Sequence, residues 1–257
     1  MADLSVYIIA YNEEEKIADA VNSVLWADEV IVADSSSSDR TAEIASALGA
    51  RVVQLEFTGF GKLRNDAIAS CTHEWIFSLD ADERCTAEAA EEIRRIINAD
   101  DSADAYFTPR KNWFMGRWIR HCGWYPDYRQ PQLFRRGALL FETGDKVHES
   151  YRVNGTTAHM QAAIWQFPFR NMAQALDKAN RYSSLGVDRL EAKGARAGMG
   201  HALLRGLWSF FRIYILKLGF LDGWAGFVIA FSNLEGVFYR YAKLCERKYG
   251  WDRPPQS

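Results

Sequence analysis

Short apolar runs alternate with amphipathic helical segments over the first 110 residues of the chain. The apolar runs are rich in β-branched and aromatic residues, which favours strands, whereas the segments between them space their apolar residues three or four apart. The apolar runs cover residues 4–10, 29–33, 51–55, 74–79 and 104–109. The helical segments cover residues 13–25, 39–49, 62–71 and 87–98. This alternation predicts an α/β fold, with a mainly parallel sheet flanked by helices.

Three of the helical segments have recognisable start signals. Asn12 stands before the first segment with Glu15 three residues later, while Asp39 and Thr86 stand before the second and the fourth. Side-chain oxygens of these residue types accept hydrogen bonds from the unpaired N–H groups of a first helical turn. We therefore predict that Asn12, Asp39 and Thr86 cap their helices.

The pattern changes after residue 110. Aromatic and basic residues broken by glycine and proline fill residues 110–165, which predicts loops and short antiparallel strands. The remaining segments are a helix over residues 169–193, a glycine-rich break over residues 193–206 and two aromatic helices up to Tyr249. The chain is thus predicted to divide into an α/β domain over residues 1–165 and a helical C-terminal region over residues 166–257.

Charge is distributed unevenly along the chain. The formal net charge of −2 combines 22 acidic and 8 basic residues over residues 1–105 with 11 acidic and 23 basic residues over residues 106–257. A strongly basic half favours an anionic partner. Nucleic acid would suit that charge, but the sequence has no recognisable nucleic-acid-binding module, so we expect no nucleic acid partner. The composition, 48% hydrophobic and 25% charged, is that of a folded domain with a sizeable core.

The cysteines and the chain start bear on the cellular compartment. Four cysteines lie far apart, without a C-x-x-C pair or zinc-site spacing, and the start MADLSVYIIAYNEEE lacks a basic region and a cleavable apolar core. We therefore expect free thiols and a cytoplasmic location. The longest uncharged stretch of the aromatic C-terminal region, Gly223–Leu234, has 12 residues, whereas a helix needs roughly 20 to cross a bilayer. We therefore expect that it does not cross a membrane, although it can lie on one.

Polar and acidic residues follow the first, second and fourth predicted strands. The sequences there are AYNEE from Ala10, ADSSSSD from Ala33 and DADE from Asp80. Since the carboxyl ends of parallel strands meet at one edge of the sheet, where ligands of such folds bind, these stretches are expected to lie together. The residues gathered there would be the acids Glu13, Asp34, Asp80 and Asp82, with Lys62 and Arg64 entering from the segment after the third strand.

The residue types at this edge suit a nucleotide and a metal ion. A carboxylate such as Asp34 accepts hydrogen bonds from a base imide or a ribose hydroxyl. Two carboxylates one residue apart, Asp80 and Asp82, hold a divalent cation through oxygen and leave positions open for phosphate, while the ion offsets their mutual repulsion. Lys62 and Arg64 add positive charge for a diphosphate.

Each of these residues taken singly has a simpler interpretation. An isolated D-x-D is most often a solvated turn, Glu13 would favour the first turn of its helix through the helix dipole, and Lys62 and Arg64 would be surface cations. Other kinds of site lack their sequence motifs, since there is no G-x-G-x-x-G after the first strand, no G-x-x-x-x-G-K-[ST] and no G-x-S-x-G. It is the order of the whole set at successive strand ends that favours a nucleotide site.

Four stretches carry a resemblance to a known family. In order over residues 4–83 they read SVYIIAYNEEEKI, VIVADSSSSDRTAEIA, GFGKLRNDAI and WIFSLDADE. Together they resemble the inverting glycosyltransferases of family 2, which have a Rossmann-like GT-A fold. The stretch PQLFRRGALLFETGDKVHES further resembles the branch of that family that adds a hexose to the inner core of bacterial lipopolysaccharide. The resemblance implies a nucleotide-sugar-binding catalytic domain over residues 1–165, with UDP-glucose as the donor.

The resemblance also implies roles for individual residues. The sequence lacks the Gln-x-x-Arg-Trp signature of processive polysaccharide synthases, so a single sugar transfer is expected. The implied roles are nucleoside contacts for Tyr11, Glu13 and Asp34, approach to the nucleotide for Lys62 and Arg64, contact with ribose or metal for Asp80, and ligation of Mg²⁺ or Mn²⁺ on the diphosphate for Asp82.

Inversion needs a base that removes the proton of the acceptor hydroxyl as this attacks the anomeric carbon. A carboxylate is the usual choice, and Glu149 in KVHES is our candidate, with Asp127 in WYPDYRQP as the reserve. His148 would be a third metal ligand or a phosphate contact. The alternative for Glu149 is a surface ion pair with a neighbour such as Lys146.

Aromatic residues recur at helical spacing in the C-terminal region. Arg240, Lys243 and Arg247 mark a separate basic face. Amphipathic helices of this kind suit an anionic membrane surface, which would make the protein peripheral on the inner face of the cytoplasmic membrane with a lipid-linked glycan as acceptor. Packing on the catalytic domain or on a second copy in a homo-oligomer is the competing interpretation. The aromatic stripe consists of Trp224, Phe227, Phe231, Leu234, Phe238 and Tyr241.

Two other functions fit parts of the sequence. A sugar-nucleotide pyrophosphorylase also uses strand-end acids and a metal, but it normally has a glycine-rich basic loop near the N-terminus, which this sequence lacks. A catalytically silent protein would bind a nucleotide sugar or a lipid without turnover. We therefore expect a metal-dependent glycosyltransferase and keep these two functions as alternatives.

Overall fold

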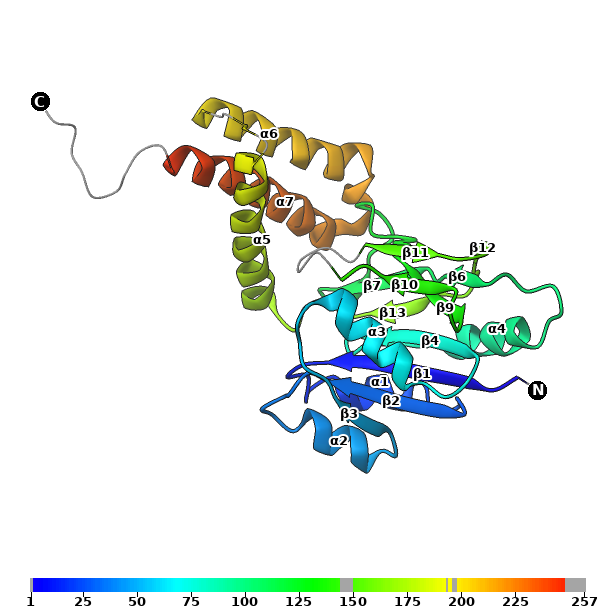
Figure 1. Cartoon of the computed structure of the whole chain (residues 1–257). Helices are drawn as coiled ribbons and strands as arrows, with labels where there is room; N and C mark the ends of the chain where they lie inside the picture. Colours follow the sequence, from blue (N-terminus) through cyan, green and yellow to red (C-terminus); the bar gives the residue numbers. More distant parts are fainter. Residues whose placement is uncertain (1, 144–149, 193, 196–197, 248–257) are drawn as a thin grey trace, which may run out of the picture. The chain divides into compact units, whose positions relative to one another are not determined.

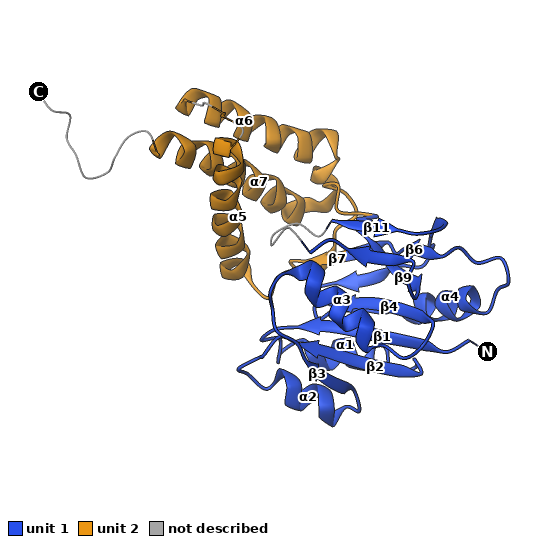
Figure 2. Ribbon diagram, viewed as in Figure 1, with its two compact units in different colours: residues 1–111, 126–167 blue, residues 112–125, 168–257 orange. Residues whose placement is uncertain are grey.

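The computed structural model describes residues 2–143, 150–192, 194–195 and 198–247 (Figure 1). The chain forms two compact units, unit 1 with Met1–Lys111 and Pro126–Phe167, and unit 2 with Asn112–Tyr125 and Pro168–Ser257 (Figure 2). The short segment Asn112–Tyr125 thus belongs with the C-terminal helices, although it interrupts unit 1 in the sequence. The predicted division of function at residue 165 stays a prediction.

A seven-stranded sheet in the order β12-β6-β9-β4-β1-β2-β3 forms the centre of unit 1. β1 to β4 run parallel, β9 is antiparallel to both β4 and β6, and β12 is parallel to β6. The α/β fold with a mainly parallel sheet is therefore confirmed. The strands are β1 (Leu4–Ala10), β2 (Glu29–Asp34), β3 (Arg51–Gln54), β4 (Trp75–Asp80), β6 (Ala105–Phe107), β9 (Pro131–Arg135) and β12 (Thr157–His159).

Helices cover both faces of this sheet, as Figure 1 shows. They are α1 (Ile17–Asn22), α2 (Thr41–Ala47), α3 (Phe60–Ser70) and α4 (Ala87–Ile97). Along β1, Val6 and Ile8 belong to a core cluster that includes residues of α1 and α4, whereas Tyr7 belongs to a second cluster with Ala67 of α3. Successive strand side chains point to opposite faces, so a strand buried on both faces is apolar at nearly every position. This explains why β1 is apolar apart from Ser5, whose buried hydroxyl donates to Glu29 Oε2 at 2.5 Å.

The later part of unit 1 supplies short strands, as the sequence predicts. β10 (Leu139–Phe141) pairs antiparallel with β11 (Tyr151–Val153), and β5 (Glu83–Arg84) pairs antiparallel with β13 (Ile164–Gln166). β12 departs from the expected antiparallel pattern because it joins β6 in parallel. The pairing of β5 with β13 matters for function, since β5 directly follows the end of β4.

The described part of unit 2 holds a short hairpin and three α-helices. β7 (Arg110–Phe114) carries the chain out of unit 1 and pairs with β8 (Arg117–Trp118). α7 packs against both α5 and α6, and a small core joins the helices to Ile119 and Cys122 of the hairpin segment. The helical elements are α5 (Met172–Ala192), α6 (Met199–Phe211), the π-helical turn η1 (Arg212–Leu216), the 3₁₀ turn η2 (Gly219–Asp222) and α7 (Gly223–Glu246).

No single helix in the part of the chain that the structure describes is both long enough and apolar enough to cross a membrane. Met199–Leu216 and Gly219–Glu246 meet the requirements of length and composition only as a pair, and they are bent by 73° at the break between them.

Two local expectations are wrong. Asn12 does not cap α1, which begins at Ile17; its backbone has a φ of 53°, and its Oδ1 accepts a hydrogen bond from the N–H of Ser38 at 2.9 Å. The glycine-rich break is shorter than predicted, because α6 begins at Met199 and continues through Gly206. A Cβ on Gly206 would stand 3.1 Å from the carbonyl oxygen of Leu234, so this glycine permits the close approach of α6 and α7.

The Thr86 cap prediction is confirmed, whereas Asp39 stands one residue before the N-cap of α2, which is Arg40, and bonds to the helix start from there. Thr86 Oγ1 accepts the N–H of Ala89 at 3.1 Å in the first turn of α4. The carboxylate of Asp39 accepts the N–H of Thr41, the first residue of α2, at 3.0 Å. Both bonds satisfy N–H groups that a helix start would otherwise leave without a partner.

Candidate active site

The register of the parallel strands brings the predicted site residues to one edge. Ala10, the last residue of β1, lies opposite Asp34 at the end of β2, and Ile9 lies opposite Asp80 at the end of β4. Adjacent strands are about 4.8 Å apart, so the backbones of Asp34 and Asp80 flank the end of β1 at a separation on the order of 10 Å. The loops that follow these three strands therefore meet at the carboxyl edge of the sheet.

Asp34 is fully buried and joins the loops after β1 and β2. Its carboxylate accepts hydrogen bonds from the N–H of Ser37 at 3.0 Å and from the Ser37 hydroxyl. The same hydroxyl accepts the N–H of Asn12 at 2.9 Å, and Thr41 Oγ1 accepts the N–H of Glu13 at 2.8 Å. These bonds fix the backbone on both sides of position 11. The exposed side chain of Tyr11 and the half-buried one of Glu13 thus come from a fixed loop beside Asp34.

The turn after β4 is built on two ion pairs to buried arginines. Arg64 on α3 donates to Asp80 Oδ1 at 3.0 Å and to Ser78 Oγ at 3.3 Å. Arg110 donates through Nε to Glu83 Oε1 at 2.5 Å, and Glu83 Oε2 accepts the N–H of Asp80 at 3.0 Å. Arg64 is 3% exposed and Arg110 is 1% exposed. Arginines of the protein therefore already neutralise part of the acidic DADE turn.

Burial and the arginines act in opposite directions on these two carboxyls. Burial alone would raise the pKa of Asp80, but the charges of Arg64, Arg110 and Arg129 outweigh it and lower that pKa. Burial raises the pKa of Glu83 above its ordinary value, even though Arg110 opposes this. Asp80 thus stays ionised and suited to bind a cation, whereas Glu83, with no exposed surface, holds the turn in shape.

Asp82 and Asp80 fit a metal ion that arrives together with a diphosphate. Asp82 is half-buried, its Oδ2 lies 3.5 Å from Gln166 Nε2, and its carbonyl accepts the N–H of Phe167 at 2.8 Å. Among the described residues, no three His, Cys, Asp or Glu side chains gather as a metal cage. Mg²⁺ is commonly bound by only one or two carboxylates plus substrate phosphates and water. Two carboxylates at this edge satisfy that pattern.

Lys62 and Arg64 occupy different environments on α3. Arg64 is buried and bonded to Asp80, so it positions that carboxylate. The side chain of Lys62 is half exposed, and its Nζ lies 2.6 Å from Asp66 one helical turn away. An exposed pair of this kind contributes little to stability, so Lys62 can exchange Asp66 for a ligand at low cost.

Of the two base candidates, Asp127 lies within the described residues. Asp127 has a left-handed backbone with a φ of 46°, and its carboxylate pairs with Arg129 at 2.6 Å. Its carbonyl accepts Arg110 Nη1 at 3.1 Å, which ties this loop to the arginine that also holds Glu83. Glu149 and His148 lie outside the described residues.

Sequence reasoning missed Arg110 and Gln132, which organise the turn after β4. Gln132 Nε2 donates to Glu83 Oε2 at 2.9 Å and to the carbonyl of Ser78 at 3.1 Å. Arg110 stands in TPRKNWF beside another cation, where a surface position is the ordinary expectation for an arginine. The only sequence feature that pointed to such partners was Glu83, because an acid so close to the end of a buried strand needs a buried partner for its charge.

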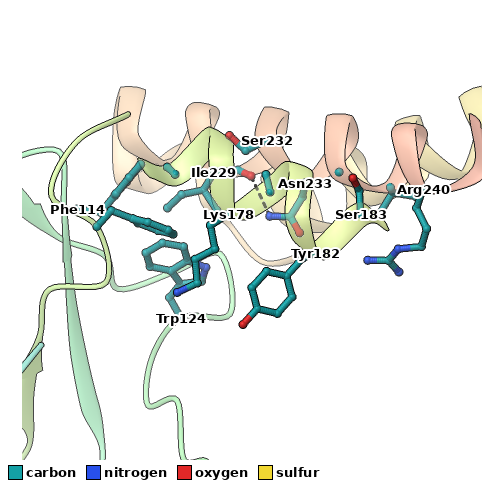
Figure 3. A pocket seen from close by; sticks show the side chains of 14 residues that line it. Phe114, Trp124, Lys178, Tyr182, Ser183, Ile229, Ser232, Asn233 and Arg240 are labelled. Atoms are coloured by element: carbon teal, nitrogen blue, oxygen red, sulfur yellow. Dashed lines mark hydrogen bonds between the residues drawn. The ribbon is translucent and has the colours of Figure 1, made fainter. Parts of the chain in front are cut away.

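Unit 2 contains a separate cavity of about 340 Å³ between α5 and α7. Figure 3 shows the rings of Phe114 and Trp124 at one end of it and the guanidinium of Arg240 at the other, with Lys178 and Tyr182 between them. No acidic residue is among the described residues that line it. The cavity contains none of the predicted site residues, and its lining suits an apolar or anionic group.

Comparisons with known proteins agree with this architecture. Residues 5–150 match the family described as Glycosyl transferase family 2. An uncharacterised glycosyltransferase of Rickettsia felis is 30% identical over 257 residues, covering 96% of this chain and 90% of that protein. The lipopolysaccharide core biosynthesis glycosyltransferase LpsC of Rhizobium meliloti is 25% identical, covering 95% and 92%. Residues 1–349 of S. aureus TarS, crystallised with UDP-GlcNAc, share the GT-A fold with a TM-score of 0.52 at 18% identity, covering 98% of this chain and 93% of that one.

Proposed function

We propose that this chain, which belongs to glycosyl transferase family 2, transfers a single hexose from UDP-glucose to a lipid-linked glycan such as the inner core of lipopolysaccharide. The observation that carries the proposal is the strand register, which sets Asp34 and Asp80 on either side of the end of β1. The similarity to LpsC supports the acceptor class. TarS, which binds UDP-GlcNAc, supports a UDP-sugar as the donor.

The donor nucleotide lies along the carboxyl edge of the sheet in this proposal. Asp34, held in place by Ser37, accepts hydrogen bonds from the base or the ribose, and Tyr11 and Glu13 border the same position. Arg129, whose side chain is 48% exposed, and Lys62 offer positive charge to the diphosphate.

Asp80 and Asp82 are the proposed ligands of Mg²⁺ or Mn²⁺, with His148 as a further ligand or a phosphate contact. Such an ion, when bound, stabilises the negative charge that develops on the departing diphosphate. Arg64 keeps Asp80 ionised and in position, and the Glu83–Arg110 pair fixes the turn that carries both aspartates. The protein thus supplies a rigid turn, which lowers the cost of assembling the site around the donor.

The reaction is an inverting glycosyl transfer. The oxygen of the acceptor hydroxyl forms a bond to the anomeric carbon of the donor while the bond from that carbon to the diphosphate oxygen breaks. UDP leaves with the bonding electron pair, and the proton of the hydroxyl passes to a carboxylate. We assign this base to Glu149 and keep Asp127 in reserve, because Asp127 is already ion-paired with Arg129.

The proposed place of action is the inner face of the cytoplasmic membrane. Residues 1–165 form the catalytic domain, and residues 166–257 hold the protein at the membrane, where a lipid-linked acceptor lies. The basic composition of the second half supports this arrangement, because the inner membrane surface is anionic.

Transfer of labelled glucose from UDP-glucose to purified lipopolysaccharide core tests the proposal. We expect product with Mn²⁺ and none after chelation with EDTA. Asp34→Asn should abolish transfer, whereas the matched control Asp101→Asn, at an exposed position outside the sheet edge, should retain it. Glu149→Gln should lower transfer more than Asp127→Asn if Glu149 is the base.

Two results would contradict this function. Exchange of pyrophosphate with UTP, without transfer to any acceptor, would identify a pyrophosphorylase. Tight binding of a nucleotide sugar, with neither transfer nor slow hydrolysis of the donor in the presence of Mn²⁺ and a range of core acceptors, would identify a binding protein.

A further inference from the structure

Cations outnumber acids at one end of unit 2. Over residues 199–234 the sequence has Arg205, Arg212 and Lys217 but a single acid, Asp222. Residues 112–125 add the cations Arg117 and Arg120, with His121 next to Arg120 in the sequence, and have no acid. Asp222 is only 2% exposed. The surface formed by these two segments is therefore cationic.

Asp222 is used inside the protein to hold this end together. Its carboxylate accepts the backbone N–H of Arg120 at 3.2 Å and that of His121 at 2.8 Å, and it lies 3.2 Å from His121 Nδ1. The bonds join η2 to the segment after β8. Among the described residues, the side chain of Asp222 pairs with that of His121, and no ion pair joins it to the side chain of Arg117, Arg120 or Lys217.

The cations of this end lie close to one another. A Cβ on Gly223 would stand 2.9 Å from Arg117 Nη1, and a Cβ on Gly123 would collide with Lys217 Nζ, so both side chains lie against glycine backbone. Arg120 stacks on the Trp118 ring at 4.3 Å. A hollow of about 370 Å³ opens beside Arg117 and Arg120. We call Arg117, Arg120, His121 and Lys217 the basic turn; the hollow is lined by Arg117, Trp118, Arg120, His121, Leu221 and Asp222.

Large apolar side chains are exposed next to the basic turn. Trp224 is 79% exposed, and Leu221 is 52% exposed. Leu218, also exposed, has a left-handed backbone with a φ of 55°, which marks a sharp turn between η1 and η2. We call Leu218, Leu221 and Trp224 the apolar rim.

Further large apolar side chains are exposed on α6 and α7. α7 packs inward through small side chains such as Ala225 and Ala230, whereas Trp224 and Phe231 of its aromatic stripe are exposed. α6 exposes Leu203, Leu204, Leu207, Trp208 and Phe211. An apolar surface of this extent is typical of a protein or membrane contact.

We propose that the basic turn binds the phosphate headgroups of an anionic bilayer while the apolar rim inserts beneath them. Charge distinguishes a membrane contact from a symmetric dimer contact. An anionic lipid surface attracts clustered cations beside apolar and tryptophan side chains, whereas contact with the same face of a second copy would bring like charges together. This inference rests on the membrane association proposed above. Its test uses neither donor nor acceptor, so its failure would leave the transferase function standing.

Flotation of the full chain with lipid vesicles tests the inference. We expect binding to phosphatidylcholine vesicles that contain one third phosphatidylglycerol, weak binding to pure phosphatidylcholine, and a marked loss of binding at high salt. Arg117→Gln combined with Lys217→Gln should lower the partition coefficient roughly thirtyfold, since each cation near the surface contributes about one factor of five. Arg181→Gln with Arg189→Gln removes two exposed cations of α5 and should change it little.

A matched pair of leucine variants tests the apolar rim. Leu221→Ser should weaken binding several-fold, whereas Leu176→Ser on α5, at a position 51% exposed, should not. The proposal would be overturned if each control variant on α5 weakened vesicle binding as much as the variant that it is compared with. It would also be overturned if the wild type failed to bind anionic vesicles. A dimer that Leu221→Ser converts to monomer in solution without any change in vesicle binding would overturn it as well, because the rim would then be a subunit interface.

Discussion

The carboxyl edge of the sheet in unit 1 and the basic turn of unit 2 use charge in opposite ways. At the sheet edge, Asp80 is paired with Arg64, and Glu83 is paired with Arg110 inside the protein. In the basic turn, Arg117, Arg120 and Lys217 form no ion pair within the described residues and lie beside exposed apolar side chains.

The difference shows that ion pairing within the protein decides whether a charged side chain fixes the local structure or can bind an external ligand. A buried pair fixes geometry, because removing either partner leaves the other charge uncompensated. An exposed cation without an acid beside it keeps its attraction for an anion from outside. We therefore interpret the first region as a preformed site for a small ligand and the second as a contact surface.

The largest difference between the regions should appear in stability. Arg110→Leu leaves Glu83 buried without its partner and should lower the free energy of unfolding by about 3–5 kcal/mol. The same substitution in the basic turn, Arg117→Leu, should change it by no more than about 0.5 kcal/mol. Urea denaturation of both variants measures these changes in the free energy of unfolding. Equal losses of stability in the two variants would contradict the proposed difference between the regions.

Catalysis should depend on the sheet edge and not on the basic turn. Asp82→Asn removes a proposed metal ligand and should lower Mn²⁺-dependent release of UDP by about a hundredfold, which corresponds to about 2.7 kcal/mol. Its melting temperature should stay close to that of the wild type, because Asp82 is only half-buried. Undiminished Mn²⁺-dependent turnover in this variant would refute the metal assignment.

The dependence of stability on pH should also arise in unit 1. Burial would raise the pKa of Glu29, but hydrogen bonds from Ser5, Arg51 and Thr72 outweigh burial and lower the pKa from 4.5 to about 2. Because the folded-state pKa lies below the unfolded one, the stabilisation is present above about pH 4.5 and is lost as the pH falls toward 2.

This stabilisation amounts to at most about 3 kcal/mol. Urea denaturation at pH 7 and at pH 3 measures it, with Glu29→Gln as the comparison. The variant should be less stable than the wild type at pH 7, and the difference should shrink at pH 3. A constant difference between the two proteins would show that Glu29 is not responsible.

The smallest effect is expected at Lys62. Its exposed pair with Asp66 contributes little, so Lys62→Gln should change the free energy of unfolding by less than about 0.5 kcal/mol. Donor affinity should fall by at most about fivefold, because the lysine reaches the diphosphate only by leaving Asp66. Isothermal titration with UDP and Mn²⁺ measures this affinity, and a complete loss of binding would place Lys62 at the centre of the site.

Local patterns predicted much of the fold. The burial of β1 on both faces favours a largely apolar strand, which the sequence shows apart from Ser5, and Thr86 caps α4 as its position before the helix suggests. The cap prediction for Asn12 was wrong because its side chain accepts a hydrogen bond from the N–H of Ser38 instead, in a loop that only the folded sheet brings near. Gly206 was wrongly assigned to a break between helices, because this glycine lies within α6 and permits its close contact with α7.

The candidate site was predictable only in part. Strand order along the chain was enough to bring Asp34 and Asp80 together, since parallel strands share one carboxyl edge. The arginine that partners Glu83 was not predictable, because Arg110 lies 27 residues further along the chain and carries no local mark of burial. Pairings over such separations depend on the tertiary fold.

We propose that the carboxyl edge of the sheet binds a UDP-sugar together with a metal ion. A thermal-shift comparison of UDP-, GDP-, ADP- and CMP-sugars, each with and without Mn²⁺, tests it most directly, because a ligand of the folded state raises the melting temperature by mass action. We predict a shift for a UDP-sugar that requires Mn²⁺ and disappears in Asp82→Asn. If no sugar nucleotide shifts the protein, and UDP with Mn²⁺ also fails, the residues around Asp34 and Asp82 are not a nucleotide site.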